Sequence, residues 1–281
     1  MKNLPKRALT YLLMFALALL FLFPILWAVM SSFKTEQNVV AYPPQLLPSP
    51  FVMANYQTVL SRYPYLNWMG NSLLVTGLST LLVLVISSLA AYPLARMEFK
   101  LRGPLFALIT AMMLIPIQGY MIPLFKFLSM AGLRRTPGLS QLSLVLTAGA
   151  NITSLFILTS FFKELPISIE EAAQIDGCSE LRFFAVILLP LSKAALSSVA
   201  ILTFITNWNQ FLWPSIMLSG DKNLTLPVGM ARYFGAAAND AAFRYGPSLA
   251  AACMAVLPTI AVFLLLQRYF VEGIASTGIK G

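Results

Sequence analysis

Six blocks of apolar residues, each close to membrane-spanning length, make up most of this 281-residue chain. A helix needs about 20 apolar residues to cross the roughly 30 Å hydrocarbon core of a bilayer. Only helices and closed barrels satisfy their backbone hydrogen bonds in lipid, and these blocks are continuous rather than alternating. The sequence therefore predicts an all-α polytopic membrane protein. Its six expected transmembrane helices cover 8–30, 71–94, 104–127, 142–162, 191–212 and 248–267.

Composition supports this class and excludes several others. Hydrophobic residues make up 58% of the chain and charged residues 10%, whereas a soluble domain carries about 25% charged residues. The net charge of +9 comes from Lys and Arg that flank the apolar blocks, so we expect no nucleic-acid partner. The chain contains no histidine and no G-x-x-x-x-G-K-[ST] phosphate loop. We therefore expect no catalytic residues, no metal and no cofactor, and any ATP hydrolysis must come from another chain.

The distribution of Lys and Arg predicts the orientation. With the N-terminus inside, the short cytoplasmic connections carry more basic residues than the longer outer loops. We therefore expect a multi-pass protein of a bacterial inner membrane with both termini cytoplasmic. The first apolar block is too long for a signal peptide and is interpreted as an uncleaved helix. Three regions are expected, namely a first helix with an outer Pro-rich loop at 1–70, a transmembrane core at 71–267 and a cytoplasmic tail at 268–281.

A motif lies in the connection between the fourth and fifth apolar blocks, where 171–190 reads EAAQIDGCSELRFFAVILLP. Its candidate functional residues are Glu171, Ala172, Ala173, Asp176, Gly177, Ile187, Leu189 and Pro190. The small alanines allow another backbone to approach a short helix at 169–176, and Glu171 supplies a charge for a basic partner. Gly177 allows a bend that a side chain would resist. The motif therefore predicts a compact helix joined to the fifth transmembrane helix through a turn.

This motif resembles the EAA signature, E-A-A-x3-G-x9-I-x-L-P, of the membrane-spanning subunits of bacterial ABC importers. The resemblance implies a cytoplasmic coupling helix between transmembrane helices 4 and 5 that contacts an ATPase. The segments 208–214, 226–229 and 267–281 are similar to carbohydrate-importer permeases, including the smaller maltose-system permease. The implied partners are a second homologous permease subunit, two ATPase subunits, an extracytoplasmic sugar-binding protein, the lipid bilayer and a small-molecule sugar.

Three amides and an indole interrupt the fifth apolar block, and they belong to Asn207, Trp208, Asn209 and Gln210. Such polar groups in a membrane helix either line a translocation path or bond to neighbouring helices, and the sequence leaves both open. The resemblance to carbohydrate-importer permeases leads us to expect an acidic residue where this chain has Gln210, so Gln210 departs from the expected pattern. We predict that Asn209→Ala lowers transport without abolishing assembly. In the third block, Pro116, Gln118 and Pro123 predict a kinked helix.

Three alternatives to a sugar importer are considered. An ABC permease for another solute, such as glycerol phosphate or an amino acid, would share the motif. A secondary transporter would carry intramembrane acids or bases for ion coupling, but the expected helices contain no Asp or Glu. A polytopic membrane enzyme would need a catalytic constellation, for which the sequence offers no candidates.

Overall fold

The computed structural model describes residues 4–234 and 244–277, and all regular elements in these ranges are helices. The all-α prediction is thereby confirmed, whereas the last residues of the expected tail, 278–281, lie outside the described ranges. The chain divides into two compact units. We call Met1–Leu66 with Gly229–Leu257 the terminal unit, and Asn67–Val228 with Pro258–Gly281 the core unit. This division differs from the expected boundaries at 70/71 and 267/268, which remain predictions.

The terminal unit is tied together by side chains that bond to backbone. It contains α1 (Leu4–Ser32), α2 (Glu36–Val39), α3 (Ala54–Arg62) and parts of α14 (Leu226–Phe234) and α15 (Tyr245–Thr277). The Glu36 carboxylate accepts hydrogen bonds from the backbone N–H groups of Tyr245 at 2.7 Å and Gly246 at 3.1 Å. An acidic group at this position accepts hydrogen bonds from the free N–H donors in the first turn of α15, and its negative charge interacts favourably with the dipole of that helix. The Pro-rich stretch at 41–53 is not helical, as expected.

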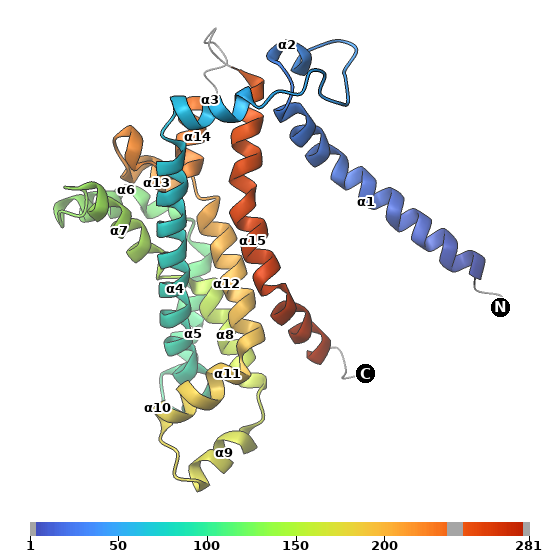
Figure 1. The fold of residues 1–281 in the computed structure, drawn as a ribbon. Helices are drawn as coiled ribbons and strands as arrows, with labels where there is room; N and C mark the ends of the chain where they lie inside the picture. The colour runs from blue at the N-terminus through green and yellow to red at the C-terminus, as the bar shows by residue number, and fades with distance from the viewer. Residues whose placement is uncertain (1–3, 235–243, 278–281) are drawn as a thin grey trace. The chain divides into compact units, whose positions relative to one another are not determined.

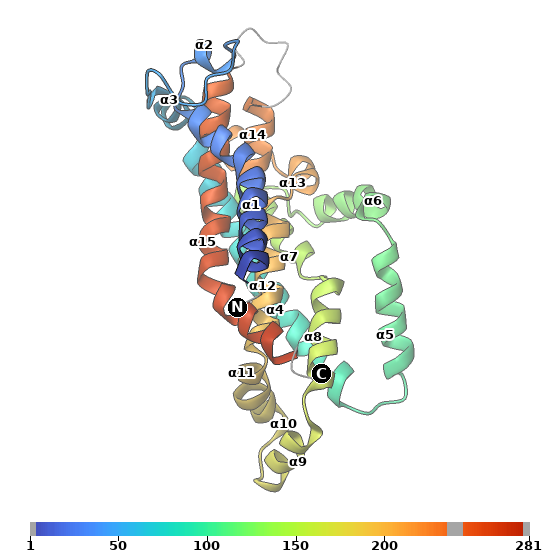
Figure 2. The ribbon, with the colours of Figure 1, turned by 90° about the vertical axis from the view of Figure 1, so that its right-hand side faces the viewer.

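The core unit is a helix bundle with a group of short helices at one end (Figures 1 and 2). Its longer helices are α4 (Tyr65–Arg96), α5 (Arg102–Ala111), α6 (Ile117–Met130), α7 (Pro137–Ala148), α8 (Ile152–Glu164) and α12 (Lys193–Trp208). Its shorter helices are η1 (Met112–Leu114), α9 (Ile167–Ile175), α10 (Glu180–Arg182), the π-helix η2 (Phe183–Leu188), α11 (Leu189–Leu191), α13 (Leu212–Met217) and η3 (Asp221–Asn223). The ends of α4 and α8 and the start of α12 lie beside α9, α10 and α11 (Figure 1).

Three helices are long and apolar enough to cross a membrane unbroken, at Thr10–Ser32, Tyr65–Arg96 and Tyr245–Arg268. Three further candidates are pairs of helices, bent by 97° between α5–η1 and α6, by 41° between α7 and α8, and by 75° between α10–α11 and α12. If each bent pair is one span, the described residues offer up to six spans. The number six therefore stays a prediction.

The breaks have identifiable local causes. Ile115 precedes Pro116 and has an extended backbone (φ −89°, ψ 109°), because a following proline disfavours the helical region. The kink expected in the third block is thus a complete break. At the second break, Asn151 caps α8 by accepting a hydrogen bond of 2.9 Å from the backbone N–H of Ser154.

The expected fifth transmembrane helix needs a correction at its end. We expected it to run through residue 212, but α12 ends at Trp208 and α13 begins at Leu212. Asn209 is the C-cap, and both its backbone N–H, at 3.1 Å, and its side-chain Nδ2, at 2.8 Å, donate to the Ile205 carbonyl. Asn209 and Gln210 therefore lie in a helix connection rather than inside a helix.

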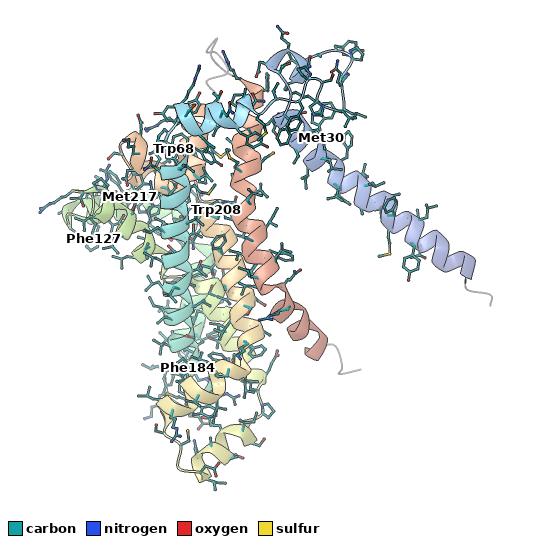
Figure 3. The ribbon with its side chains drawn as sticks, viewed as in Figure 1. Met30, Trp68, Phe127, Phe184, Trp208 and Met217 are labelled. Atoms are coloured by element: carbon teal, nitrogen blue, oxygen red, sulfur yellow. The ribbon has the colours of Figure 1, made fainter. Side chains whose placement is uncertain are left out.

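At the end of the core unit opposite α9, α10 and α11, residues at the start of α4 form hydrogen bonds to the segment that leads into α14. The indole Nε1 of Trp68 donates to the Asp221 carbonyl at 2.6 Å, and Asn71 Nδ2 donates to the carbonyls of Lys222 and Leu224, both at 2.9 Å. Ser72 Oγ accepts from the backbone N–H of Leu226 at 2.7 Å. Figure 3 shows Trp68 near this end and Phe184 near the end where α9, α10 and α11 lie.

Candidate coupling helix and transmembrane cavity

The EAA motif begins on α9 and ends that helix with a well-defined capping motif. Asp176 is the C-cap, and Gly177 follows with a φ of 74°, in the left-handed region. The Cys178 N–H donates to the Ala173 carbonyl at 2.9 Å, and the Gly177 N–H donates to the Gln174 carbonyl at 3.0 Å. This pair of bonds is a Schellman motif, which needs a residue that tolerates positive φ after the C-cap. The bend expected at Gly177 is therefore present.

The two faces of α9 have different surroundings. Ala173 is buried and belongs to an apolar cluster with residues of α4, α8, η2 and α12, including Tyr92, Phe162 and Phe184. Glu171 and Ala172 are exposed, as are Asp176 and Gly177. One alanine of the motif is thus a packing contact and the other lies on the open surface.

The second half of the motif lies on η2 and α11 and is largely structural. Phe183, Phe184 and Leu188 are buried in the same cluster, and Ile187 and Leu189 are half-buried and pack against it. Pro190 is exposed, as the second residue of α11. Because Ser192 and the 75° bend separate α11 from α12, the motif joins the fifth span at an angle rather than in line.

Large apolar side chains on the outer surface of this end were not identified from the sequence. Ile175 is 86% exposed and Leu181 78% exposed, and Ile167 and Val186 are also exposed. We call these four residues the apolar rim. Ile167 and Ile175 lie about one turn before and after the exposed Glu171 on α9, and Leu181 and Val186 follow on α10 and η2. The exposed surface of α9 therefore combines apolar area with an acidic group. The amphipathic pattern at 167–186 could have identified these four residues, because each lies within two positions of a residue that belongs to the buried cluster or packs against it.

Arg96, at the end of α4, contacts α9 from the inner side. Its guanidinium lies 3.8 Å from the carboxylate of Glu170, and Nη2 donates to the Leu165 carbonyl at 2.7 Å. The two side chains are only 6% and 15% exposed. Glu170 and Glu171 are neighbours in sequence, yet the first faces the bundle and the second faces outward.

A cavity of about 550 Å³ opens in the core unit beside the break between η1 and α6 and the break between α7 and α8. Its walls are mostly apolar and come from α4, α5, η1, α6, α7, α8, the connection after α12 and α13. The polar groups on the walls are those of Ser87, Tyr120, Thr147, Asn151, Gln210 and Trp213. The Trp213 indole Nε1 donates to Thr147 Oγ1 at 3.1 Å, which fixes both side chains in the wall. Amides, hydroxyls and an indole can bind a neutral polar solute by hydrogen bonds and stacking.

Among the residues expected to line a translocation path, Gln210 lines this cavity. Trp208 is 4% exposed and stacks on Phe204, with ring centroids 5.8 Å apart. Asn207 is half-buried, and Asn209 is exposed with its amide bonded to Ile205. Sequence reasoning missed Tyr120, Thr147 and Asn151, because they come from separate blocks that only the bends bring together.

Apolar helices of membrane-spanning length, three of them broken, and a cavity lined by a few polar side chains indicate a polytopic membrane protein with a site for a polar solute. Residues 83–276 match the family model of the binding-protein-dependent transport system inner membrane component. The match covers more than half of the chain, and the chain belongs to this family of transport permeases. Membership sets aside the secondary transporter and the membrane enzyme considered above.

Individual relatives are similar over nearly the whole length. The chain is 36% identical to the trehalose/maltose transport system permease protein MalG of Thermococcus litoralis, covering 98% of each chain. It is 33% identical to the arabinooligosaccharides transport system permease protein AraQ of Bacillus subtilis, covering 94% of this chain and 92% of the relative. A crystal structure of a bacterial ABC transporter involved in the import of the acidic polysaccharide alginate has a similar fold, with a TM-score of 0.80 at 22% identity and coverage of 96% and 98%.

Proposed function

We propose that this chain is a permease subunit of a bacterial ABC importer for sugars, and that α9 with the apolar rim docks on a separate ATPase subunit. The relatives named above are permeases of saccharide transport systems, and the cavity offers the polar groups that sugars bind. The observation that carries the proposal is the separation of the two faces of α9. Ala173 packs the helix against the bundle and Glu170 faces Arg96, while Glu171 and the rim are left exposed.

The exposed rim needs a partner. Large apolar side chains that are exposed beside charged residues, away from the lipid-facing blocks, mark interaction sites in proteins. A helix whose apolar anchors lie in a groove of another protein is a recurrent mode of recognition. We infer that the rim fills a groove on the ATPase and that Glu171 bonds a basic side chain at the edge of this groove.

Basic residues support the proposed orientation. At the end of the core unit that carries α9, the Lys and Arg residues are Arg96, Lys100, Arg102, Lys163, Arg182 and Lys193. Cytoplasmic connections are enriched in such residues, so this end is assigned to the cytoplasm. Six spans would then place both chain termini on the same side. A second permease subunit, a second ATPase and an extracytoplasmic sugar-binding protein would complete the assembly.

The coupling follows from the buried cluster. When the ATPase subunits close on ATP, a docked α9 moves with them, and the cluster transmits the displacement to α4, α8 and α12. These helices surround or adjoin the cavity, so its access can alternate between the two sides. ATP and the liganded receptor each bind one of two conformations of the transporter more tightly. They thereby shift the population of transporters toward that conformation.

The docking is tested with the assembled transporter. Glu171→Lys and Ile175→Asp should leave membrane insertion intact but abolish ATP-driven uptake, and Ile175→Asp should also reduce copurification with the ATPase. Glu164→Lys is a matched control, because Glu164 is exposed at the end of α8, outside the rim. Normal uptake in both rim variants would refute the docking role.

The cavity is tested separately with two neighbouring amides. Gln210 lines the cavity and Asn209 does not. Gln210→Ala should lower sugar uptake more than Asn209→Ala, with assembly and receptor-stimulated ATP hydrolysis retained in both. An equal or opposite ranking would remove this cavity from the translocation path.

A further inference from the structure

We propose that Arg96 is a positioning residue that transmits movement of α9 directly to α4, through an ion pair with Glu170 that closes in one state of the transport cycle. This inference rests on the proposed coupling function and assigns a route that the EAA motif does not contain. Arg96 lies 74 positions before Glu170 in the sequence and outside the motif at 171–190.

One guanidinium connects three elements. Arg96 belongs to the last turn of α4, donates to the Leu165 carbonyl at the end of α8, and faces Glu170 in the first turn of α9. A cation at the end of α4 also interacts favourably with the dipole of that helix. Movement of α9 relative to the bundle must therefore stretch, shorten or break this contact.

The end of α4 is rigid enough to respond as a unit. The guanidinium of Arg102 donates to the carbonyls of Leu94 and Ala95, both at 2.9 Å, and to that of Met97 at 3.3 Å. These carbonyls would otherwise be free acceptors at the helix end, which is where helices fray. Because Arg102 closes this end, displacement of Arg96 moves the helix rather than a loose last turn.

The same helix forms part of the cavity wall. Ile86, Ser87 and Ala90 of α4 line the cavity, and Ser87 lies nine residues before Arg96, or about 14 Å along the helix axis. The route from α9 to the cavity through Arg96 thus uses a single continuous helix, which contains Pro93 between Ala90 and Arg96. The other route, through α11 and α12, includes the 75° bend.

The pair is incomplete in the conformation seen here. At 3.8 Å the two groups are too far apart for a hydrogen bond, and Arg96 Nε and Glu170 Oε2 are buried without a hydrogen-bond partner. Buried charged groups left without hydrogen bonds are unfavourable, whereas a charge-assisted bond between them would form at about 2.8 Å. A shift of about 1 Å by α9 is therefore enough to close the pair. The open pair seen here and a closed pair in another state are the two discrete arrangements that a transmitting contact requires.

The decisive measurement is sugar uptake per ATP hydrolysed by the complete transporter in proteoliposomes, supplied with its receptor. Glu170→Gln removes the ionic bond, and Glu170→Asp keeps the charge but shortens the side chain. Both should retain ATP hydrolysis, because the rim and Glu171 are unchanged. Uptake per ATP should fall by roughly tenfold or more, the factor expected when one state loses a hydrogen bond between charged groups. The double variant Arg96→Glu/Glu170→Arg should recover part of the loss seen with Arg96→Glu alone.

Other outcomes separate this inference from the proposed function. If Glu171→Lys and Ile175→Asp abolish uptake while both Glu170 variants keep wild-type uptake per ATP, docking stands and the Arg96 route is refuted. A purely structural role predicts less assembled transporter with an unchanged ratio of uptake to hydrolysis, which also refutes the route. Failure of both Glu170 variants to assemble would make the pair a folding contact and overturn the inference as well.

Discussion

The backbone N–H of Cys178 donates a hydrogen bond of 2.9 Å to the carbonyl of Ala173, across the turn that ends α9. Between them Gly177 has a φ of 74°, and no atom of a neighbouring residue lies within 4 Å of where its Cβ would be. The glycine of the motif is therefore required by backbone conformation and not by lack of space. This distinction yields a specific expectation for two substitutions.

Gly177→Ala should destabilise the end of α9 by about 1–2 kcal/mol, the cost of the left-handed conformation for a residue with a Cβ. Gly177→Asn should cost less, because asparagine tolerates this region through local hydrogen bonds. We expect ATP-driven uptake to follow the order glycine, asparagine, alanine at equal amounts of assembled transporter. Gly103→Ala is the control, since Gly103 also has open space but a negative φ. If alanine and asparagine behave alike at position 177, the backbone explanation is wrong.

Arg102 provides a second prediction, which concerns stability. Its guanidinium donates to three carbonyls at the end of α4, so Arg102→Met leaves these acceptors without their charged donor while keeping the aliphatic part of the side chain. Hydrogen bonds to charged groups each contribute about 1.5–3 kcal/mol. We expect a lower thermal denaturation midpoint for the detergent-purified transporter. Lys100→Met, two residues earlier on an exposed position, should change the midpoint little. Equal midpoints for the two variants would contradict the capping role.

The sequence predicted the short helix at 169–176 and its bend at Gly177 closely, because both depend on neighbouring residues. The helical motif, its small residues and its glycine act within one or two turns, where local propensity decides the structure. The break at Pro116 was foreseen as a kink for the same reason. Its size of 97° depends on how the two halves pack, which no local pattern contains.

Contacts between distant segments could not be predicted in this way. Glu170 and Glu171 are chemically identical in the sequence, and only the position of Arg96 reveals that they face opposite directions. Likewise, the amides at Asn209 and Gln210 look equivalent in the sequence, but the Asn209 side chain donates back to the Ile205 carbonyl whereas Gln210 lines the cavity. The polar residues of the cavity come from separate blocks, so their proximity appears only once the bends are known.

A third prediction concerns the terminal unit, where Gly246 lies against Asn55. A Cβ at Gly246 would lie 2.7 Å from both amide atoms of Asn55, closer than side chains pack. Asn55 cannot move freely, because its Nδ2 donates to the carbonyls of Ser32 at 2.8 Å and Lys34 at 2.9 Å. Gly246→Ala should therefore destabilise the protein by about 1–3 kcal/mol.

A double-mutant cycle on thermal stability checks this expectation. In an Asn55→Ala background the clash is absent, so the added cost of Gly246→Ala should largely disappear. Asn55→Ala alone should also destabilise the protein, because two carbonyls lose their donor. Additive effects of the two substitutions would show that the residues are not in contact.

The last prediction tests the wall of the cavity through Thr147. Its hydroxyl accepts from the Trp213 indole at 3.1 Å and donates to the Ser143 carbonyl at 2.9 Å. Thr147→Val keeps the shape but leaves the indole N–H, on a side chain 2% exposed, without this acceptor. An unsatisfied buried donor costs about 1–3 kcal/mol, so Trp213 should reorient and disturb the cavity. We expect sugar uptake to fall several-fold while receptor-stimulated ATP hydrolysis continues, because α9 and its rim are unaffected. Thr147→Ser retains the hydroxyl and should keep most uptake. Equal loss in the valine and serine variants would mean that the methyl group, rather than the hydrogen bond to Trp213, matters at this position.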